Sequence, residues 1–336
     1  MEKDIFVKIA ESIDNLMCTD MASRGIINHL YDAARELTSE PLSYTVAKAC
    51  LDKLEPMDKV IIVTGWIDQP LVSPDRGESD GPAGAVALAR ALNVACKVCP
   101  IIMVDECLVE SMEEVARASG FECVPVEKLE NSIKLNRLRT LSVVGFPRGH
   151  EAGKTFGKEA LEKYQPKMCM SIERGGINEK GIIHNMLGAD TGVEQAFMDY
   201  MFNDAREKEI FTVAIGDGGN ELGMGNIKAT IQKEVPNGFK CQCPCCSGIA
   251  VSTKVDLLLA SSISNWGAYG IATMIAAMSG KFAALQTPAE EMRILEASAR
   301  AGFHDGMFGC LGTSVDGCPA ESHVSMITLM RQVAKI

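Results

Sequence analysis

The sequence predicts an α/β fold with a mainly parallel sheet flanked by helices. Short segments rich in Val, Ile and Leu alternate with helical patterns along most of the 336 residues, and this alternation is typical of parallel sheets. The strand-like segments are apolar throughout, as in 60–64 (VIIVT), which indicates strands covered on both faces. With 47% apolar residues, the chain can bury the core of one large domain or two modest ones.

Residues 1–57 are expected to form an N-terminal helical cap. Apolar residues recur there at helical spacing, which predicts helices over 4–35 and 42–54. The residues that set this spacing are Ile5, Ile9, Ile13 and Leu16. Residues 58–336 are assigned to the α/β domain, which forms one compact unit with the cap; a division into two lobes is the alternative.

Within the α/β domain, each predicted strand is short, rich in β-branched residues and followed by turn residues such as Gly65. In chain order, strands are predicted at 60–64, 97–104, 121–126, 139–146, 167–172, 211–215 and 255–260. Helices are predicted where apolar residues recur every three or four positions instead. They span 84–94, 109–119, 156–164, 193–208, 225–234, 267–279, 288–301 and 320–334.

The charge balance excludes several classes of partner. Acidic residues outnumber basic ones by 44 to 33, for a net charge of −11, whereas nucleic acid requires a basic face. No segment approaches the roughly 18 uninterrupted apolar residues of a membrane-spanning helix. The N-terminus (MEKDIFVKIAESIDNL) carries charges where an export signal would be apolar. We therefore expect a cytoplasmic protein with no nucleic-acid or membrane partner; its oligomeric state stays open.

Thirteen cysteines are a high number for a chain without a visible export signal, and we expect them to be reduced. Cys96 and Cys99 form a C-x-x-C pair in an apolar segment, where strand packing is favoured over a redox or metal role. Four more lie close together, at Cys241, Cys243, Cys245 and Cys246. Their spacing differs from that of paired zinc motifs, so loop thiols prone to oxidation are favoured, with a structural metal as the alternative.

Four predicted strands lead into loops that combine glycines with acidic or amide side chains. In an open parallel sheet, the loops at the carboxyl ends of the strands gather at one edge, where ligands bind. Glycine allows the backbone of such loops to approach a ligand closely. We therefore expect one site that contains Glu78, Asp80, Glu173, Asp217, Asn220, Glu221 and Asn265.

Oxygen ligands of this kind favour a hard cation. The chain has five histidines, and none shows the paired spacing of a zinc site. Carboxylates and amides instead suit Mn²⁺ or Mg²⁺, with Ca²⁺ as an alternative. Asp217 and Glu221 are four residues apart and would share one face if the turn enters a helix.

Three common catalytic or nucleotide-binding motifs do not fit. The segment 148–155 (RGHEAGKT) resembles a phosphate loop, but its first glycine is displaced by one position. No G-x-S-x-G hydrolase motif is present. The segment GDGGN at 216–220 does not match the dinucleotide fingerprint.

The motifs together resemble the D-glutamate cyclase family, specifically its C-terminal catalytic-type domain. In order, the matching segments are ESDGPAGA from Glu78, SIER from Ser171, IGDGGNELGMGN from Ile215, SNWGAY from Ser264 and VDG from Val315. The similarity runs over nearly the whole chain and is closest to the stand-alone prokaryotic form. The segment 241–246, which holds the four clustered cysteines, has no counterpart in the family pattern.

The resemblance implies a hydro-lyase that dehydrates D-glutamate to 5-oxo-D-proline, with a divalent metal, in a fold reminiscent of metal-dependent phosphoesterases. It also adds Asp305 and Asp316 to the expected site. We assign the catalytic roles to Asp80, Glu173, Asp217 and Glu221. The expected metal ligands are Glu78, Asp80, Glu173, Asp217, Glu221 and Asp316. The expected substrate-binding residues are Arg174, whose guanidinium would clamp the α-carboxylate, and Asn220, Asn265 and Asp305.

Two other functions remain open from the sequence. The same carboxylates could hold Mn²⁺ or Mg²⁺ ions that activate water against a phosphate ester. Alternatively, the chain could bind a metabolite without turning it over, although binding alone would not require so many titratable groups.

Overall fold

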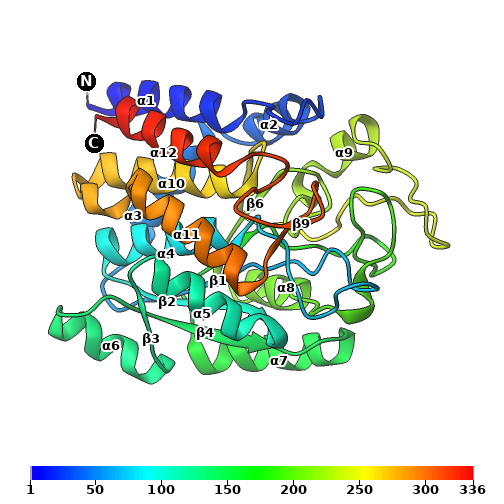
Figure 1. Cartoon of the computed structure of the whole chain (residues 1–336), viewed down its shortest axis with the longest axis horizontal. Helices are drawn as coiled ribbons and strands as arrows, with labels where there is room; N and C mark the ends of the chain where they lie inside the picture. The colour runs from blue at the N-terminus through cyan, green and yellow to red at the C-terminus, as the bar shows by residue number, and fades with distance from the viewer. Residues whose placement is uncertain (1, 336) are drawn as a thin grey trace.

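Seven parallel strands form one sheet in the computed structural model, which describes residues 2–335 (Figure 1). The strand order is β3-β4-β2-β1-β5-β6-β7, and every neighbouring pair is parallel. The strands are β1 (Lys59–Val63), β2 (Cys99–Asp105), β3 (Glu122–Cys123), β4 (Thr140–Phe146), β5 (Met168–Ile172), β6 (Phe211–Gly216) and β7 (Leu257–Ala260). The predicted α/β class is thereby confirmed, and the sheet is entirely rather than mainly parallel.

Helices cover both faces of this sheet. The chain moves from β1 toward β2 in one direction and from β5 toward β6 in the other, so right-handed crossovers place α4 and α8 on opposite faces. Helix α10 packs against α4, and α7 packs against α8 (Figure 1). The helices on and around the sheet are α4 (Pro82–Cys96), α5 (Val109–Ala118), α6 (Val126–Leu135), α7 (His150–Tyr164), α8 (Asp199–Glu207), α9 (Lys228–Glu234), α10 (Ser264–Ser279) and α11 (Pro288–Ala301).

The N-terminal helices form a further layer, in which the first and third pack against α10 and the second packs against β7 and α9. They are α1 (Glu2–Met17), α2 (Ile27–Glu36) and α3 (Leu42–Lys53), and the C-terminal α12 (Ala320–Ala334) packs beside α1 (Figure 1). A short antiparallel pair, β8 (His304–Asp305) and β9 (Cys310–Leu311), lies between α11 and α12 in the chain. Single 3₁₀ turns occur at Glu106–Leu108, Gly192–Glu194, Gly225–Ile227 and Phe282–Ala284.

The prediction of one helix over 4–35 is wrong, because the chain turns between α1 and α2. Ser23 and Gly25 adopt positive φ angles of 53° and 74°, which no helix accommodates. The Asp20 carboxylate accepts hydrogen bonds from the backbone N–H groups of Arg24 (3.0 Å) and Gly25 (2.6 Å) and so closes the turn. This break places Arg24 near the carboxyl edge of the sheet.

Three other predicted elements differ from the structure. The strand predicted at 121–126 is limited to β3, and the helix α6 that follows it was not predicted. Pro125 ends the extended segment and precedes the first turn of α6, a position that suits its fixed φ. Helix α8 begins at Asp199 rather than at 193, and α7 begins at His150 rather than at 156.

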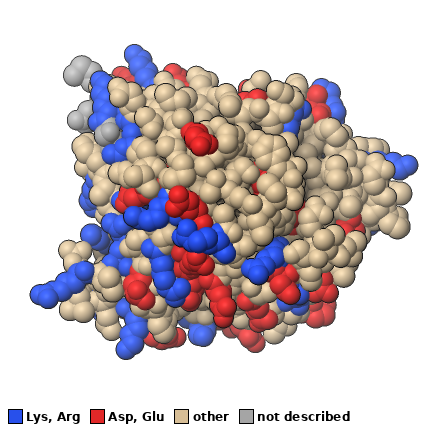
Figure 2. All heavy atoms as spheres, in the orientation of Figure 1, with Lys and Arg blue, Asp and Glu red and all other residues tan. Residues whose placement is uncertain are grey.

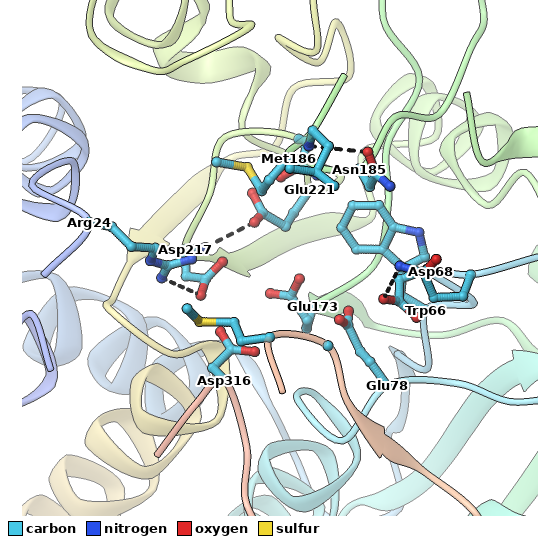
Figure 3. A pocket seen from close by; sticks show the side chains of 15 residues that line it. Arg24, Trp66, Asp68, Glu78, Glu173, Asn185, Met186, Asp217, Glu221 and Asp316 are labelled. Atoms are coloured by element: carbon cyan, nitrogen blue, oxygen red, sulfur yellow. Dashed lines mark hydrogen bonds and ion pairs between the residues drawn. The ribbon is translucent and has the colours of Figure 1, made fainter. Parts of the chain in front are cut away.

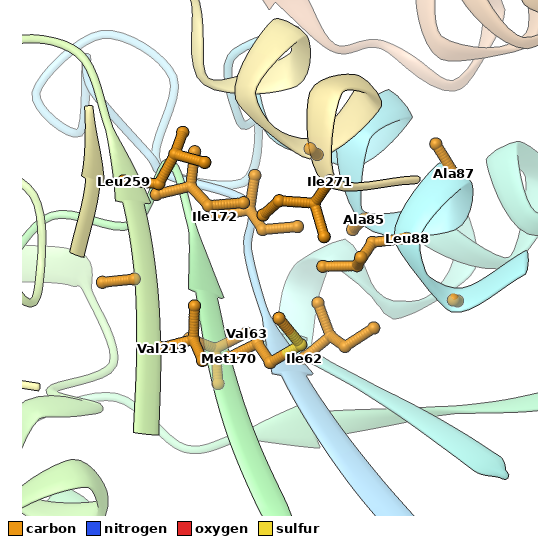
Figure 4. Close-up of a cluster of buried hydrophobic side chains, with 14 of the residues drawn as sticks. Ile62, Val63, Ala85, Ala87, Leu88, Met170, Ile172, Val213, Leu259 and Ile271 are labelled. Carbon is orange, nitrogen blue, oxygen red and sulfur yellow. The ribbon is translucent and has the colours of Figure 1, made fainter. Parts of the chain in front are cut away.

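The core between the sheet and the upper helices is made of aliphatic side chains from the central strands and from α4 and α10 (Figure 4). Alanines on α4 let this helix lie close to both the sheet and α10. The side chains labelled in Figure 4 include Ile62, Val63, Ala85, Leu88, Met170, Ile172, Val213, Leu259 and Ile271. Because the strands are buried on both faces, their near-continuous apolar sequence follows from the layered packing.

The surface in Figure 2 carries acidic and basic side chains side by side, without a continuous basic area on that face. Within residues 2–335, no helix combines the length and the apolar character needed to span a membrane.

The strand order also locates the functional edge. Crossovers run in opposite directions from β1 and β5, which are neighbours in the sheet. The loops that leave the carboxyl ends of these two strands therefore diverge and leave a crevice between them. Such switch points are where parallel α/β sheets bind ligands.

The contact between α4 and α10 yields a stability prediction. A Cβ at Gly84 would lie 2.8 Å from Asn265 Oδ1 and 3.0 Å from Ala268 Cβ. Gly84→Val should therefore lower the free energy of unfolding by about 1–3 kcal/mol in urea titrations. Gly312→Val is the matched control, since a Cβ there meets nothing within 4 Å. Equal losses in both variants would contradict the close packing of the two helices.

Candidate active site

A cavity of about 140 Å³ opens at the carboxyl edge of the sheet, beside β1, β5 and β6 (Figure 3). Its wall includes Arg24, Glu78, Glu173, Asp217, Glu221 and Asp316. Figure 3 shows these carboxyl groups around one central space, which they enter from different loops. Arg24 enters the same space from the turn between α1 and α2. Residues from distant parts of the chain thus meet at the predicted sheet edge.

The loop after β6 is wrapped around one of its own carboxylates. Glu221 accepts hydrogen bonds from the backbone N–H groups of Gly218 (2.6 Å, Oε1) and Gly219 (2.7 Å, Oε2). Gly219 has a φ of 103°, a conformation that favours glycine. The loop therefore holds Asp217, at its start, at the rim of the cavity. Glu221 is fixed and nearly inaccessible to solvent.

Asp80 joins the first turns of α4 and α10. Its carboxylate accepts hydrogen bonds from the backbone N–H groups of Gly81 (3.0 Å), Ser264 (2.8 Å) and Asn265 (2.9 Å). Asn265 Oδ1 in turn accepts from the N–H groups of Gly81 and Gly84, at 3.1 and 2.5 Å. The N-termini of two helices thus converge on one carboxylate, where their unpaired N–H groups and dipoles favour negative charge.

Glu173 and Glu78 are held less tightly. Glu173 follows β5 with a φ of +44°, a region where a residue with a Cβ is uncommon, and its Oε2 accepts a hydrogen bond from the Ser264 hydroxyl at 2.6 Å. Glu78 is buried, and its Oε1 has no hydrogen-bond partner among residues 2–335. Both carboxyl groups therefore keep oxygen atoms available to a ligand.

The concentration of carboxyl groups raises their pKa values. Burial, with Asp217 nearby, raises the pKa of Asp80 to about 7 and that of Glu221 to about 8. Burial and neighbouring carboxylates also raise the pKa values of Glu78, Glu173 and Asp316 well above the ordinary range. Without a bound cation, the cavity therefore retains protons near neutral pH.

Arg24 supplies positive charge to this wall. Its Nη2 lies 2.7 Å from Asp217 Oδ2 and donates a second hydrogen bond to the Ser262 carbonyl at 2.6 Å. The Asp217 carboxylate raises the pKa of Arg24 further above its usual value, so the guanidinium stays charged. Its side chain keeps 20% of its surface exposed, which leaves it within reach of a ligand.

Two sets of carboxyl oxygens are close enough to hold a cation. One set comprises Asp80, Asp217 and Asp316, and the other comprises Glu173, Asp217 and Glu221; in each set, one oxygen from every residue lies within 4.8 Å of the others. Asp217 belongs to both. The all-oxygen donor set and the unpartnered Glu78 oxygen fit a hard divalent cation.

The sequence of this chain matches a known protein family. A family profile described as D-glutamate cyclase-like, C-terminal, matches residues 13–331. The chain belongs to this family. The resemblance drawn from the ordered motifs is thereby confirmed.

Two known proteins show how distant the similarity of this D-glutamate cyclase-like chain to individual proteins can be. Human mitochondrial D-glutamate cyclase is 25% identical over 348 aligned residues, which cover 95% of this chain and 51% of the human protein. The chain thus spans about half the length of this curated relative. Among solved structures, ureidoglycine-glyoxylate aminotransferase from Bacillus subtilis is 12% identical over 96% of this chain and 63% of its own. Its TM-score of 0.25 is too low to support an argument.

The structure brings most of the expected site residues of this family member together. Seven of them lie at the cavity or in its carboxylate sets: Glu78, Asp80, Glu173, Asp217, Asn220, Glu221 and Asp316. Asn265 instead supports the first turn of α4. Asp305 accepts hydrogen bonds from the backbone of Met307, Phe308 and Gly317 and so shapes the loop that carries Asp316.

Arg174 lies outside the cavity, in contrast to the expectation that it clamps the substrate. Its side chain has no exposed surface and forms an ion pair with the equally buried Asp105. It also donates hydrogen bonds to the carbonyl oxygens of Gly65 (2.7 Å) and Ala196 (2.6 Å). Arg174 therefore ties three loops together beneath the site. Its neighbour Glu173, by contrast, lines the cavity.

Sequence reasoning missed several residues of the cavity wall. Arg24 was hidden by the prediction of one continuous helix. Trp66 and Asp68 also line the cavity, and His304 forms an ion pair with Asp68 at 2.7 Å. The interaction with the Asp68 carboxylate raises the pKa of His304. Asp68 lies four residues beyond the predicted strand 60–64, in the loop at its carboxyl end, so a search of that whole loop would have found it.

The raised carboxyl pKa values predict an unusual pH dependence of stability. In the unfolded chain these groups titrate near ~4, whereas Glu221 in the folded protein titrates at about 8. Because the folded state binds more protons across that window, the metal-free protein should lose stability as the pH rises through it. Thermal unfolding in chelator from pH 5.5 to 8.5 measures this loss. Glu221→Gln should flatten the profile, and a stability that rises with pH would contradict the electrostatic picture.

The buried pair predicts a structural role for Arg174. Replacing Arg174 by Met leaves the Asp105 carboxylate buried without its partner, which should cost about 3–5 kcal/mol of unfolding free energy. Arg117→Met is the control, because its ion pair with Glu113 is exposed and should contribute less than about 1 kcal/mol. If Arg174→Met kept full stability but lost affinity for substrate, the assignment of Arg174 to the scaffold would be wrong.

Proposed function

We propose that this chain catalyses the dehydration of D-glutamate to 5-oxo-D-proline with the help of a divalent cation. The observation that carries the proposal is the set of buried carboxyl groups around one small cavity, in a chain of the D-glutamate cyclase-like family. The human relative that aligns with 95% of the chain is a D-glutamate cyclase. The preference for the D enantiomer derives from this relationship.

The reaction closes a five-membered ring within one molecule. The α-amino nitrogen forms a bond to the carbon of the side-chain carboxyl group, and one oxygen of that carboxyl group leaves as water. Since both reacting groups belong to the same substrate, the cavity must mainly hold glutamate in a bent conformation. A small, walled cavity at a rigid sheet edge is suited to that task.

The side-chain carboxylate of glutamate is a poor electrophile, and this is the chief barrier. A cation held by Asp217 with Asp80 and Asp316, or with Glu173 and Glu221, would withdraw charge from that carboxylate and stabilise the charge that develops on its oxygens. Mn²⁺ and Mg²⁺ fit these oxygen donors, and Ca²⁺ is the alternative.

Proton transfer falls to the carboxyl groups that keep free oxygens. The α-ammonium nitrogen loses two protons in total, one before it attacks and one as the lactam forms, and the departing oxygen gains two to leave as water. Glu173 and Glu78 are suited to these steps because the pKa of each is raised, and because each has an oxygen without a hydrogen-bond partner among residues 2–335. The oxygens of Asp80 and Glu221 accept hydrogen bonds from backbone N–H groups. These two carboxyl groups therefore position the loops and bind the cation rather than transfer protons.

Arg24 takes the substrate-binding role that the sequence assigned to Arg174. Its guanidinium lines the cavity and can pair with the α-carboxylate of glutamate while Nη2 stays on Asp217. Asn220 donates to the His184 carbonyl at 2.8 Å, and its buried Oδ1 lacks a partner in the described chain. That oxygen can accept a hydrogen bond from the substrate ammonium group.

The direct test incubates the purified protein with D- or L-glutamate and follows 5-oxoproline by NMR, with Mn²⁺ or with chelator. We expect product from the D enantiomer in the presence of metal. Asp217→Asn should reduce the rate by about 10²–10⁴-fold, because Asp217 belongs to both carboxylate sets that would hold the cation. The control is Asp32→Asn, at an exposed position of α2.

Product formation at the wild-type rate by Asp217→Asn would remove this residue from the mechanism. Absence of product from either enantiomer, with the cation shown to be bound, would remove the cyclase proposal.

The shared position of Asp217 favours one other reaction class, phosphoester hydrolysis. Two neighbouring cations bridged by a carboxylate are a common arrangement for that chemistry. A phosphoesterase would act on phosphate-containing substrates and would be indifferent to the configuration of glutamate. A screen of phosphate esters alongside the two glutamate enantiomers therefore separates the two proposals.

A further inference from the structure

A second group of side chains is close enough together to hold a metal ion, and no carboxylate belongs to it. It comprises His184, Cys241, Cys243 and Cys245, which we call the His–Cys cluster. The imidazole of His184 is 1% exposed, Cys241 is 3% exposed and Cys243 is 9% exposed. Cys246, the fourth cysteine of the segment, is exposed and lies outside the cluster.

The distances within the His–Cys cluster match those around a tetrahedral zinc ion. Cys241 Sγ lies 3.6 Å from Cys243 Sγ and 3.3 Å from Cys245 Sγ. His184 Nε2 lies 3.2 Å from Cys243 Sγ and 3.6 Å from Cys245 Sγ. With Zn–S bonds of about 2.3 Å, the ligand atoms of a tetrahedral site stand about 3.5–3.8 Å apart. Shifts of a few tenths of an ångström would therefore accommodate the ion.

Backbone and amide donors already surround the sulfur atoms. The N–H of Cys245 donates to Cys243 Sγ at 3.4 Å, and Asn178 Nδ2 lies 3.5 Å from Cys245 Sγ. Hydrogen bonds of this kind stabilise thiolates and orient metal ligands. Three thiolates and one neutral imidazole form a standard closed zinc site.

The surrounding chain explains why such a site would be useful. Residues 173–198 and 235–256 are two long segments with little regular secondary structure, and they pack against each other. Asn237 Nδ2 donates to the Met186 carbonyl and the Gln242 N–H donates to the Gly188 carbonyl, both at 3.0 Å. Segments of this length without helices or strands need another source of order. The His–Cys cluster joins the two at their centre.

The cluster is also connected to the cavity. His184 is followed by Asn185, Met186 and Leu187, all of which line the cavity wall. The carbonyl of His184 accepts a hydrogen bond from Asn220, in the loop that presents Asp217. A group that holds His184 in place would therefore also hold one side of the cavity in place, although His184 itself does not line the cavity.

We propose that His184, Cys241, Cys243 and Cys245 bind one structural zinc ion that joins the segments 173–198 and 235–256 and orders the cavity wall at 185–187. The site is separate from the carboxylate cation site and does not depend on the reaction assigned there. Its soft sulfur donors select Zn²⁺, whereas the oxygen donors of the cavity select Mg²⁺ or Mn²⁺.

The decisive experiment uses the wild-type protein, purified under reducing conditions, stripped of metal and titrated with Co²⁺. Tetrahedral thiolate ligation gives intense visible d–d bands and a near-ultraviolet thiolate-to-cobalt band, which carboxylates cannot produce. We expect both bands to saturate at one equivalent and to disappear when Zn²⁺ is added. Absence of the thiolate band in folded wild-type protein would overturn the proposal.

Variants identify the ligands. Elemental analysis after dialysis should find about one zinc per chain in the wild type and in the control Cys246→Ser, since Cys246 lies outside the cluster. Cys243→Ser and His184→Asn should each reduce retained zinc at least 10-fold. Asp217→Asn should retain zinc and the cobalt bands, which separates this site from the cavity. Equal zinc loss in Cys246→Ser and Cys243→Ser would contradict the ligand set.

Thiol titration tests the alternative of oxidation-prone thiols. A disulfide between Cys241 and Cys245 in freshly purified protein, with no bound zinc, would show that the cluster is a redox pair and would overturn the metal assignment.

Discussion

The burial of many carboxyl groups around one cavity is the constraint on which the rest of this structure depends. Unpaired buried charge is costly, and a protein offsets it with protons, hydrogen bonds or cations. The cavity uses protons, hydrogen bonds and an arginine side chain, and it has room for a divalent cation. The raised pKa values of Asp80 and Glu221 retain protons, backbone N–H groups bind the same two carboxylates, and Arg24 contacts Asp217. A divalent cation would complete the balance by displacing the protons.

The fold supplies the positions that make this arrangement stable. Divergent crossovers from β1 and β5 open the edge of the sheet, and the first turns of α4 and α10 meet at Asp80. The close approach of these helices requires Gly84, and the loop around Glu221 requires Gly219. Carboxylates bound by the backbone are held rigidly, whereas Glu173 and Glu78 keep oxygens for a ligand. The same loops thereby provide both a scaffold and reactive groups.

The sequence predicted those parts of the site that follow directly from strand periodicity. Glu173 and Asp217 come immediately after apolar strands, so their place at the carboxyl edge was predictable. Arg24 was not, because a turn closed by Asp20 interrupts a pattern that is otherwise helical. Arg174 was misplaced because its chemistry suits a carboxylate ligand, while its partner Asp105 comes from another strand end. His184 lies 57 residues before Cys241, so only the folded chain shows that they meet.

The proposed function requires the carboxylate cavity to be a cation-dependent site distinct from the His–Cys cluster. Anomalous diffraction from crystals grown with Mn²⁺ and recorded on both sides of the manganese and zinc absorption edges tests it most directly. We expect a manganese peak within coordination distance of Asp217 and a zinc peak among His184, Cys241, Cys243 and Cys245. A cavity without manganese at saturating concentration, or manganese confined to surface carboxylates, would contradict the claim.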